Sequence, residues 1–427
     1  MERCHKVLAE GVELAVCRSQ QFKTGLLSVT LAVPLAEQTA TAYALAPEVL
    51  FRGSRNYPDM ERLSAAADQL YGAVIGPGVR QRGESQCVSF LCSFIDDRYA
   101  LDGTALLEPA TQLLGEVLLD PATQDGVFCK DYVAGEGANL ADEINARVND
   151  KRGWSIFRLT QEMCAGEAYA LDKLGDAQQA VALGPQELWG HYQRLLEGAR
   201  VIFYYGGSAE PERVEQAVRR SFAPLIRDRN THLPCQVVST PGRAVRRVEE
   251  GMDVTQGKLA MGFRTGGVTM GTPDYPALLV CNALYGGTAH SKLFRNVRER
   301  MSLCYFVSSM LDAVKGLMVV SSGVEFAQFD RAEQAILEQL EAVRRGDFDQ
   351  GEHQAAVRSV VNALLSRRDS QGQMEQDCVT QLLAVGGWTA PEELAAAVER
   401  VSPQQVAHVA GQIGLDTVYR LTGKEEG

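Results

Sequence analysis

Two glutamates in the first half of the sequence, Glu136 and Glu143, stand seven residues apart in "GEGANLADEI". In an α-helix this spacing leaves the two side chains about 20° from alignment on one face. Carboxylates that share a helix face can help to hold a metal ion. They can equally form surface ion pairs, because Glu143, Arg147 and Lys151 follow one another at intervals of four residues. The spacing alone leaves both interpretations open.

A second pair of residues with useful chemistry lies in the second half: Arg298 in "FRNVRER" and Tyr305 in "LCYF". A guanidinium can donate two hydrogen bonds to a peptide carbonyl, and a phenol can donate to an oxygen that gains charge when water attacks. The same residue types also end helices in solvent and fill strands. Their role therefore depends on the sequence around them.

Other catalytic motifs are missing from the sequence. None of the six histidines (His5, His191, His232, His290, His353 and His408) has a histidine or an acidic residue at a recognised zinc spacing. There is no GxSxG elbow and no GxxxxGK[ST] loop, so neither a serine hydrolase nor a nucleotide enzyme is predicted. The ten cysteines form no CxxC pair, which favours buried free thiols.

Composition limits the class of protein. A chain of 427 residues is longer than one core usually supports, so two domains are expected. The 42 basic residues against 54 acidic ones give a net charge of −12, which argues against a general nucleic-acid binder. The N-terminal sequence lacks an apolar signal core, and no apolar run reaches about 18 residues. These features predict a cytoplasmic protein without a membrane segment.

The apolar pattern predicts alternating strands and helices in the first half. Strands are expected in "VELAVCRS", "GLLSVTLAVPL", "CVSFLCSFI" and "ARVIFYYGG". Helices are expected over residues 39–50, 59–70 and 106–119, and a long one from near Asp125 to beyond Val148. The Pro- and Arg-containing stretch "APLIRDRNTHLPCQVVSTPGR" breaks this periodicity. We interpret that stretch as a linker.

The second half then repeats the same order of elements. Strand "KLAMGFRTG" precedes helices in "DYPALLVCNALYGG" and "HSKLFRNVRER", two strands in "SLCYFVSSML" and "GLMVVSSGV", and helices from Phe326 onward. This order predicts an α+β fold built from two tandem repeats, each an antiparallel sheet packed with helices. The predicted domains are residues 1–222 and 246–427, joined by a linker over 223–245.

Several strings in the sequence resemble the pitrilysin/insulinase family of zinc peptidases, which includes mitochondrial processing peptidase. They are the helix end "LFRG", the segment "YGGTAHSKLFRNVRERMSLCYFVSS" and the strand "GLMVVSSGV". In addition, "NDKRGWSIFRLTQEMC" resembles a non-catalytic branch of the family, which includes a member associated with 5-aminopentanol modification of elongation factor P. The resemblance covers most of the chain.

The resemblance implies that this chain has lost its catalytic metal site. Catalytic members carry His-x-x-Glu-His on the helix that ends in "LFRG", and the matching positions here are Ala44, Pro47 and Glu48. Ala44 has no lone pair to offer a metal, and Pro47 can neither ligate nor accept a proton. A proline inside a helix also predicts that this helix is kinked or begins near Pro47. Glu48 is expected to be a solvated carboxylate, because one carboxylate binds zinc weakly.

The same resemblance gives the two residue pairs their expected roles. Glu143 corresponds to the family's third zinc ligand and Glu136 to the glutamate seven residues before it, although the distance from Glu48 to Glu143 is longer than is usual and a surface ion-pair ladder is the preferred interpretation. Arg298 and Tyr305 match the arginine and tyrosine that bind substrate opposite the zinc of the other domain. This half of the active site is therefore expected to persist.

These expectations lead to three hypotheses about function. The leading one is a non-catalytic subunit of a heterodimeric zinc peptidase, which binds peptide through Arg298, Tyr305 and a free strand edge. It would have no cofactor of its own, with zinc on a partner subunit of the same family. The second is a structural or binding scaffold without a proteolytic role. The third is an autonomous peptidase that uses Glu48, Glu136 and Glu143.

Overall fold

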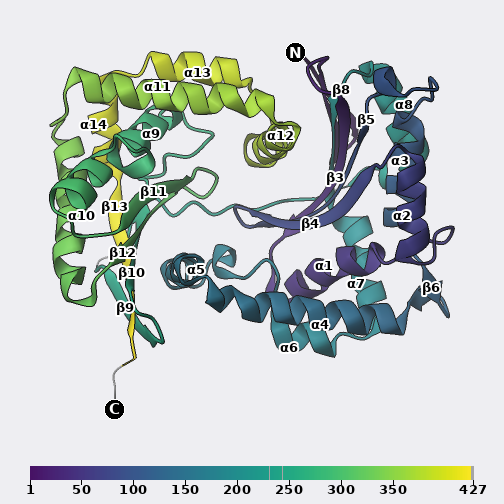
Figure 1. Ribbon diagram of the computed structural model, residues 1–427, viewed down its shortest axis with the longest axis horizontal. Coiled ribbons are helices and arrows are strands. Elements are labelled where there is room, and N and C mark those ends of the chain that lie inside the picture. The colour runs from purple at the N-terminus through teal and green to yellow at the C-terminus, as the bar shows by residue number, and fades with distance from the viewer. Residues whose placement is uncertain (230, 243, 425–427) are drawn as a thin grey trace. The chain divides into compact units, whose positions relative to one another are not determined.

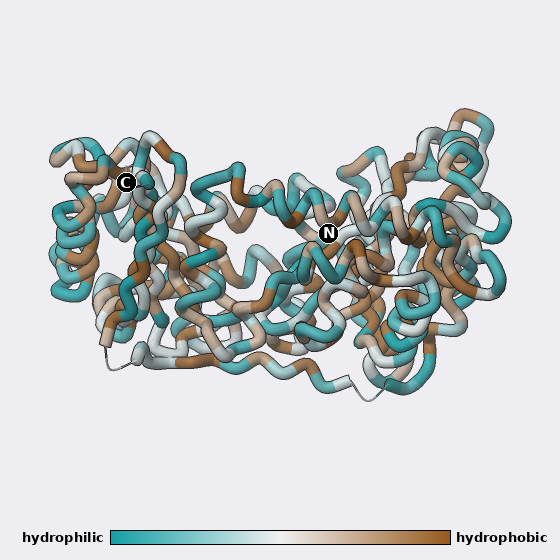
Figure 2. The backbone as a smooth tube through the Cα atoms, turned by 90° about the horizontal axis from the view of Figure 1, so that it is seen from below, coloured by the Kyte–Doolittle hydropathy of each residue, from teal (hydrophilic) through white to brown (hydrophobic). Residues whose placement is uncertain are grey.

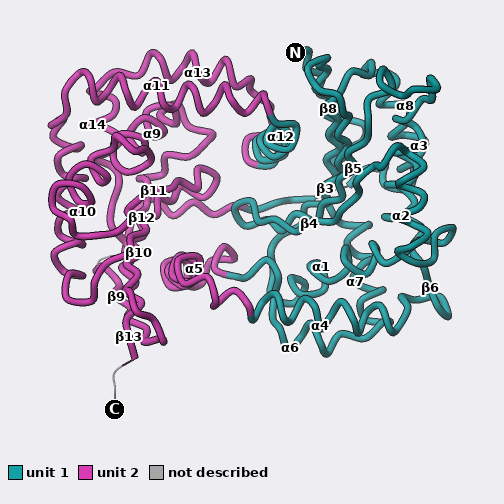
Figure 3. The backbone as a smooth tube through the Cα atoms, viewed as in Figure 1, with its two compact units in different colours: residues 1–145, 171–234, 370–383 teal, residues 146–170, 235–369, 384–427 magenta. Residues whose placement is uncertain are grey.

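The computed structural model describes residues 1–229, 231–242 and 244–424. The chain forms two compact units (Figure 3). Unit 1 comprises residues 1–145, 171–234 and 370–383, and unit 2 comprises residues 146–170, 235–369 and 384–427. Apolar residues are frequent inside each unit and hydrophilic ones on its outer helical turns (Figure 2). Each unit has its own large cluster of buried apolar side chains.

Unit 1 contains a six-stranded sheet (Figure 1). Its order is β1 (Glu2–Ala9), β2 (Val12–Arg18), β8 (Arg200–Gly207), β3 (Thr24–Pro34), β5 (Ser85–Ile95) and β4 (Val74–Arg82). Only β2 and β8 run parallel, and the other neighbours are antiparallel. The inner strands are almost wholly buried, which explains their continuous apolar sequences.

Unit 1 contains the helices α1 (Glu37–Leu50), α2 (Met60–Gln69), α3 (Leu107–Leu119), α4 (Lys130–Ala146), α6 (Ala177–Ala182), α7 (Pro185–Gly198) and α8 (Pro211–Ser221). Among them, α1, α3, α7 and α8 pack against the sheet. Local signals fix several of their ends: Asp59, for example, caps α2 by accepting from the Arg62 N–H. Pro185 and Pro211 each begin a helix, where a missing N–H does not matter.

Unit 2 contains a five-stranded sheet of order β11 (Phe306–Asp312), β12 (Leu317–Val324), β10 (Gly257–Arg264), β13 (Gly414–Gly423) and β9 (Arg246–Met252). Its helices are α9 (Tyr275–Asn282), α10 (Phe329–Arg344), α11 (Gln350–Ser366), α13 (Pro391–Glu399) and α14 (Pro403–Gln412). Two π-helical segments, η5 (Ala283–Gly287) and η6 (Leu293–Arg300), follow α9.

The two sheets share one pattern of strand pairing. In unit 2, β9 and β13 are parallel, and β13–β10, β10–β12 and β12–β11 are antiparallel. The same sequence of pairings runs through β2, β8, β3, β5 and β4 in unit 1. The predicted α+β fold with two tandem repeats is therefore confirmed. Unit 1 differs by one additional strand, β1, on the outer side of β2.

Each unit also takes one helix from the other half of the sequence (Figure 3). Helix α5 (Lys151–Met163) belongs to unit 2, where it packs on β10 and β13. Most of helix α12 (Gln371–Val385) belongs to unit 1, where Gln371 bonds the backbone of Thr24 and Gly206. The predicted linker, residues 223–245, includes one of the three points at which the chain passes from unit 1 to unit 2, between residues 234 and 235. The predicted domain boundaries stay a prediction.

The expected helix from near Asp125 to beyond Val148 is wrong at both ends. Asp125 and Gly126 have φ values of 54° and 82°, and they form the turn of a small hairpin, β6 (Thr123–Gln124) and β7 (Val127–Phe128). Helix α4 begins after this hairpin and ends at Ala146. The four-residue spacing of Glu143, Arg147 and Lys151 thus does not continue along one helix.

In the part of the chain that the structure describes, no helix is both long enough and apolar enough to cross a bilayer.

Candidate functional site

Helix α1 carries Ala44, Pro47 and Glu48, the positions that the family resemblance matched to the metal motif. Ala44 is 1% exposed and packs in the apolar core of unit 1. Pro47 is buried in the last turn of α1, where its carbonyl accepts from the Phe51 N–H. The helix begins at Glu37, so the suggestion that it begins near Pro47 is wrong. The surrounding core holds the helix together despite the bond that proline cannot make.

Glu48 lies close to the two glutamates of α4. Burial raises the pKa of the Glu48 carboxyl above its ordinary value, and the negative charges of Glu136 and Glu143 raise it further. Glu136 is buried, whereas Glu143 is exposed. The three carboxylates therefore influence one another within unit 1, and a role of Glu136 and Glu143 as remnants of a metal site stays a prediction. Glu48 is not simply a solvated carboxylate.

Arg52 supplies the positive charge in this region. Its Nη1 lies 2.9 Å from Oε1 of Glu136, and its guanidinium stands 5.2 Å from the ring centroid of Tyr132. The other oxygen of Glu136 accepts from the Asn139 side chain at 3.0 Å. Both oxygens of Glu136 thus have partners within the protein. Sequence reasoning missed Arg52, although it lies four residues after Glu48 in the "LFRG" string.

These side chains do not fit a catalytic zinc ion. The methyl group of Ala44 and the ring of Pro47 offer no donor, and Arg52 already neutralises Glu136. Within residues 1–229, 231–242 and 244–424, no three His, Cys, Asp or Glu side chains gather in a way that could hold a metal ion. Unit 1 thus has the helix on which the family resemblance placed the metal motif, but Ala44 and Pro47 on this helix offer no metal ligand.

Arg298 lies in η6 of unit 2. Its side chain is 39% exposed, its guanidinium carbon stands 4.5 Å from the ring centroid of Phe294, and its Nε is 3.6 Å from the carboxylate of Glu299. Stacking on Phe294 directs the side chain while leaving much of the guanidinium accessible. A π-helical turn widens the backbone, and such turns are frequent at functional positions.

Tyr305 lies directly before β11. The side chain is 62% exposed, which is unusual for a tyrosine beside a sheet. Its backbone N–H donates to the Gly323 carbonyl at 2.9 Å, and its hydroxyl donates to Glu325 over a long 3.4 Å. The backbone is thus fixed to β12 while the ring remains open to solvent. Tyr305 therefore does not fill the interior of a strand, and its expected role in substrate binding stays a prediction.

Arg298 and Tyr305 belong to neighbouring elements, because η6 packs against β11. Cys304 lies between the two residues in the sequence. Burial raises the pKa of its thiol, whereas a hydrogen bond with Ser322 and the positive charge of Arg298 lower this pKa. Because β11 is an edge strand, one side of its backbone has no ladder partner in the described sheet.

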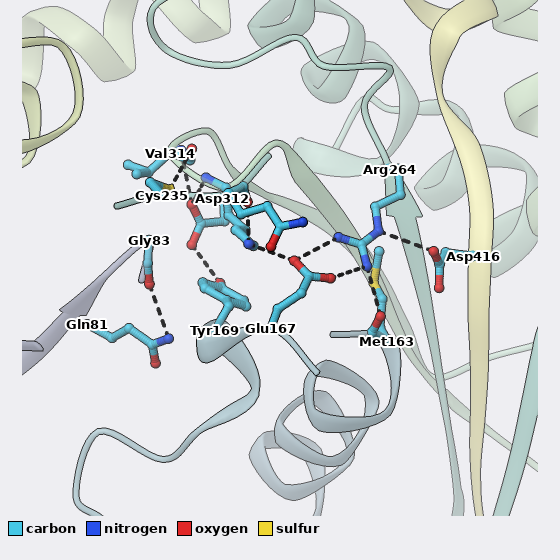
Figure 4. Close-up of polar contacts among 12 residues, drawn as sticks. Gln81, Gly83, Met163, Glu167, Tyr169, Cys235, Arg264, Asp312, Val314 and Asp416 are labelled. Carbon is cyan, nitrogen blue, oxygen red and sulfur yellow. Dashed lines mark hydrogen bonds and ion pairs between the residues drawn. The ribbon is translucent and has the colours of Figure 1, made fainter. Parts of the chain in front are cut away.

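A buried ionic network lies at the other end of β11 (Figure 4). Glu167, which follows α5, contacts Lys315 at 2.6 Å and Arg264 at 2.8 Å. Arg264 also lies 3.2 Å from Asp416 of β13. Burial by itself would raise the pKa of Glu167, but the two cations hold it below its ordinary value. Glu167 is therefore ionised and central to the network.

The network also fixes the last residue of β11. The Tyr169 hydroxyl donates to Oδ2 of Asp312 at 2.6 Å, and Asp312 accepts from the backbone N–H groups of Val314 and Lys315. Burial and the Asp312 charge raise the pKa of Tyr169, so its hydroxyl keeps its proton. Hydrogen bonds thus hold β11 at both ends, through Tyr305 to β12 and through Asp312 to this network. No local sequence signal marks these partners.

A family model described as "Peptidase M16 inactive domain" matches residues 182–360. The chain is 33% identical over 420 residues to a Bacillus subtilis protein named "Probable inactive metalloprotease YmfF", covering 97% of this chain and 96% of the relative. It is also 26% identical over 305 residues to an "Uncharacterized zinc protease" of Mycobacterium bovis, covering 70% of this chain and 68% of that protein.

Solved structures agree with these sequence relatives. A conserved protein from Enterococcus faecalis matches with a TM-score of 0.90 and 25% identity over 100% of both chains. A peptidase M16 inactive domain from Pseudomonas fluorescens has a TM-score of 0.78 at 17% identity over 99% of both chains, which shows a shared fold. A chain of "Complex III2 from Candida albicans" has a TM-score of 0.74 at 13% identity, covering 98% of this chain and 95% of that one.

Proposed function

This chain belongs to the peptidase M16 family as an inactive member, and from that premise we propose that it is the non-catalytic subunit of a heterodimeric zinc peptidase. In this role it binds extended peptide through Arg298, Tyr305 and the edge of β11. A partner subunit with an intact His-x-x-Glu-His motif carries the zinc. A cytoplasmic location and peptide processing belong to the same proposal, as does any part in elongation factor modification.

The observation that supports this proposal most strongly is a contrast between two pairs of residues that the family resemblance singled out: Ala44 and Pro47 in unit 1, and Arg298 and Tyr305 in unit 2. In unit 1, Ala44 and Pro47 are buried and chemically inert. In unit 2, the side chains of Arg298 and Tyr305 remain 39% and 62% exposed beside an edge strand. An exposed guanidinium and an exposed phenol contribute little to the stability of the fold. Their presence beside the edge of β11 therefore supports a binding role.

The chemistry of these groups suits an extended peptide. Backbone N–H and C=O groups along the open side of β11 can pair with a peptide strand, which gives affinity without regard to most side chains. Arg298 can donate to a peptide carbonyl, and the Tyr305 hydroxyl can donate to the oxygen that becomes negative during hydrolysis. This chain would thus hold and polarise the substrate, and the partner would supply the nucleophile.

The test uses the complex with a zinc-bearing family member from the same organism. Mixing the two purified chains should give a complex by size-exclusion chromatography whose activity on a fluorogenic peptide exceeds that of either chain. Tyr305→Phe or Arg298→Ala should then lower turnover by on the order of 100-fold, the usual effect of losing one such donor, without changing assembly or zinc content.

Matched controls distinguish function from general damage. Tyr99→Phe removes a hydroxyl from another exposed tyrosine, and Arg300→Ala removes an exposed arginine from the same π-helical segment as Arg298. Both controls should retain wild-type turnover. If Tyr305→Phe and Arg298→Ala are also fully active, the two residues are inherited with the fold and the proposal is wrong.

A scaffold without a proteolytic role is the second candidate. The observation in its favour is the likeness in fold to a chain of the Candida albicans complex, at a TM-score of 0.74. A zinc subunit that forms an active homodimer and gains nothing from this chain would support the scaffold. The autonomous peptidase is weaker, because Arg52 and Asn139 occupy both oxygens of Glu136.

A further inference from the structure

A groove of about 780 Å³ lies in unit 2 between helix α10 and strands β9 and β13. Strand β9 is the edge of the sheet opposite to β11, so this groove is separate from Arg298 and Tyr305. Nothing in the proposed peptidase role uses it. Its position beside an open strand edge makes it a candidate binding surface.

The internal repeat shows that one strand position beside β9 is vacant. In unit 1 the corresponding strand, β2, has β8 on one side and β1 on the other, antiparallel from Glu2 opposite Arg18 to Ala9 opposite Val12. In unit 2, β9 has β13 on one side, and no described strand on the other. Apart from that ladder, the described backbone bonds reach β9 only at the Met252 carbonyl, which accepts from Lys424.

Strand β9 is held firmly from both faces. On one face, Glu250 accepts from Trp154 at 3.2 Å and from Arg158 at 3.0 Å, and both partners belong to α5. On the other face, Arg247 contacts Glu333 of α10 at 2.6 Å. An edge that is already ordered loses little conformational entropy when a further strand is added. The backbone of β9 is therefore a preformed template.

The groove prefers positive charge. Five carboxylates and two guanidinium groups line it, a formal charge of −3. Both guanidinium groups are occupied, because Arg247 and Arg420 each bind the buried carboxylate of Glu333. Glu249 and Glu338 are exposed and remain available to a ligand, with Glu338 also accepting from the Gln334 amide at 2.9 Å, whereas Glu341 is ion-paired with Arg344. Because side chains alternate along a strand, an added strand would direct every second side chain into this groove.

We propose that the outer edge of β9 binds an extended segment of a partner protein as a sixth, antiparallel strand, with Lys or Arg at alternate positions facing the α10 groove. The occupied position beside β2 in unit 1 supplies the geometry, and the acidic lining supplies the specificity. This inference does not depend on the proposed peptidase role. The alternative is that the charged residues on β9 act only to prevent this edge of the sheet from pairing with another chain.

The experiment uses the full chain and a blocked peptide of alternating Lys and Val that has the length of β9, seven residues. Fluorescence anisotropy should show saturable binding, and hydrogen exchange should slow at amides within residues 246–252. The same peptide with Glu in place of Lys should not bind. A Lys-Val peptide with alternate backbone amides methylated keeps its charge but cannot pair as a strand, and it should bind at least tenfold more weakly.

Protein variants separate the groove from the general negative charge of the chain. Glu249→Gln with Glu338→Gln, which changes the two exposed carboxylates of the groove, should weaken binding about threefold to tenfold. Asp142→Asn with Glu197→Gln removes the same charge from exposed positions of unit 1 and should change nothing. The proposal is overturned if no saturable binding occurs, if the methylated peptide binds equally well, or if protection falls on β1, β4 or β11.

Discussion

Arg80 of the edge strand β4 is ion-paired at 2.8 Å with Glu375 of α12, although 295 positions separate the two residues in the sequence. Glu375 is fully buried and also accepts from the Ser28 hydroxyl at 3.2 Å. A helix from the second half of the chain thus packs against the sheet of the first half and forms polar contacts with its strands. In unit 2, α5 makes the reciprocal contribution, where Arg152 donates to Ser308 of β11 at 3.0 Å. One edge strand of each sheet, β4 in unit 1 and β11 in unit 2, thus contacts a helix from the other repeat.

Glu375→Gln should destabilise the protein by about 3 kcal/mol, because it leaves the Arg80 guanidinium without its buried partner. Urea unfolding followed by tryptophan fluorescence measures the change. Glu197→Gln, at an exposed position, should stay within about 0.5 kcal/mol of wild type. Equal stability of the two variants would show that the Arg80–Glu375 pair does not hold α12 in place.

Glu167→Gln should also destabilise the protein, and by an amount that depends on pH. The cations Arg264 and Lys315 lower the folded-state pKa of Glu167 below the ordinary value of 4.5. Its ionisation therefore adds stability at pH values above 4.5, and this stability is lost as the pH falls through the lowered folded-state pKa. At neutral pH we expect a loss of about 3 kcal/mol.

The expected dependence of stability on pH distinguishes an effect of the Glu167 charge from an effect of packing. Unfolding curves of wild type and Glu167→Gln should differ most near pH 7 and converge below the folded-state pKa, where the wild-type carboxyl is also neutral. A difference that stays constant down to acid pH would mean that packing, rather than charge, is responsible.

Glu48→Gln should stabilise the protein at neutral pH. Burial and the charges of Glu136 and Glu143 raise the folded-state pKa of Glu48, so its ionised form is less favourable in the folded chain than in the unfolded one. Above the raised pKa, removing the charge should add about 1 kcal/mol; below the ordinary value of 4.5 the gain should vanish. Thermal unfolding at two pH values measures it, and a destabilised variant at pH 7 would contradict the shift.

The purified chain should bind no stoichiometric zinc and should cleave no peptide by itself, since Ala44 and Pro47 can act neither as ligand nor as base. Plasma mass spectrometry of the dialysed protein gives the metal content. About one zinc per chain that is lost in Glu48→Ala would instead support the autonomous peptidase.

The sequence predicted most of the inner strands and most helices well, because residues buried on a sheet or on one helix face repeat with a fixed period. It missed β1, β4, β9 and β13, three of which are edge strands whose mixed polar sequences lack that period. It also missed the turn at Asp125 and Gly126, where a non-glycine residue adopts a positive φ. The local pattern of apolar and polar residues does not indicate a positive φ at a residue other than glycine.

By itself the sequence led to the prediction that a catalytic zinc site of the family's kind is lost, because the side chains of Ala44 and Pro47 at the matched positions cannot coordinate or accept a proton in any fold. It also identified Arg298 and Tyr305 as candidates. Only the tertiary structure decided that Arg52 neutralises Glu136, that α5 and α12 exchange between the repeats, and that β9 lacks the partner that β2 has. Those relationships join residues far apart in the chain, and they depend on strand order and packing, which local composition does not encode.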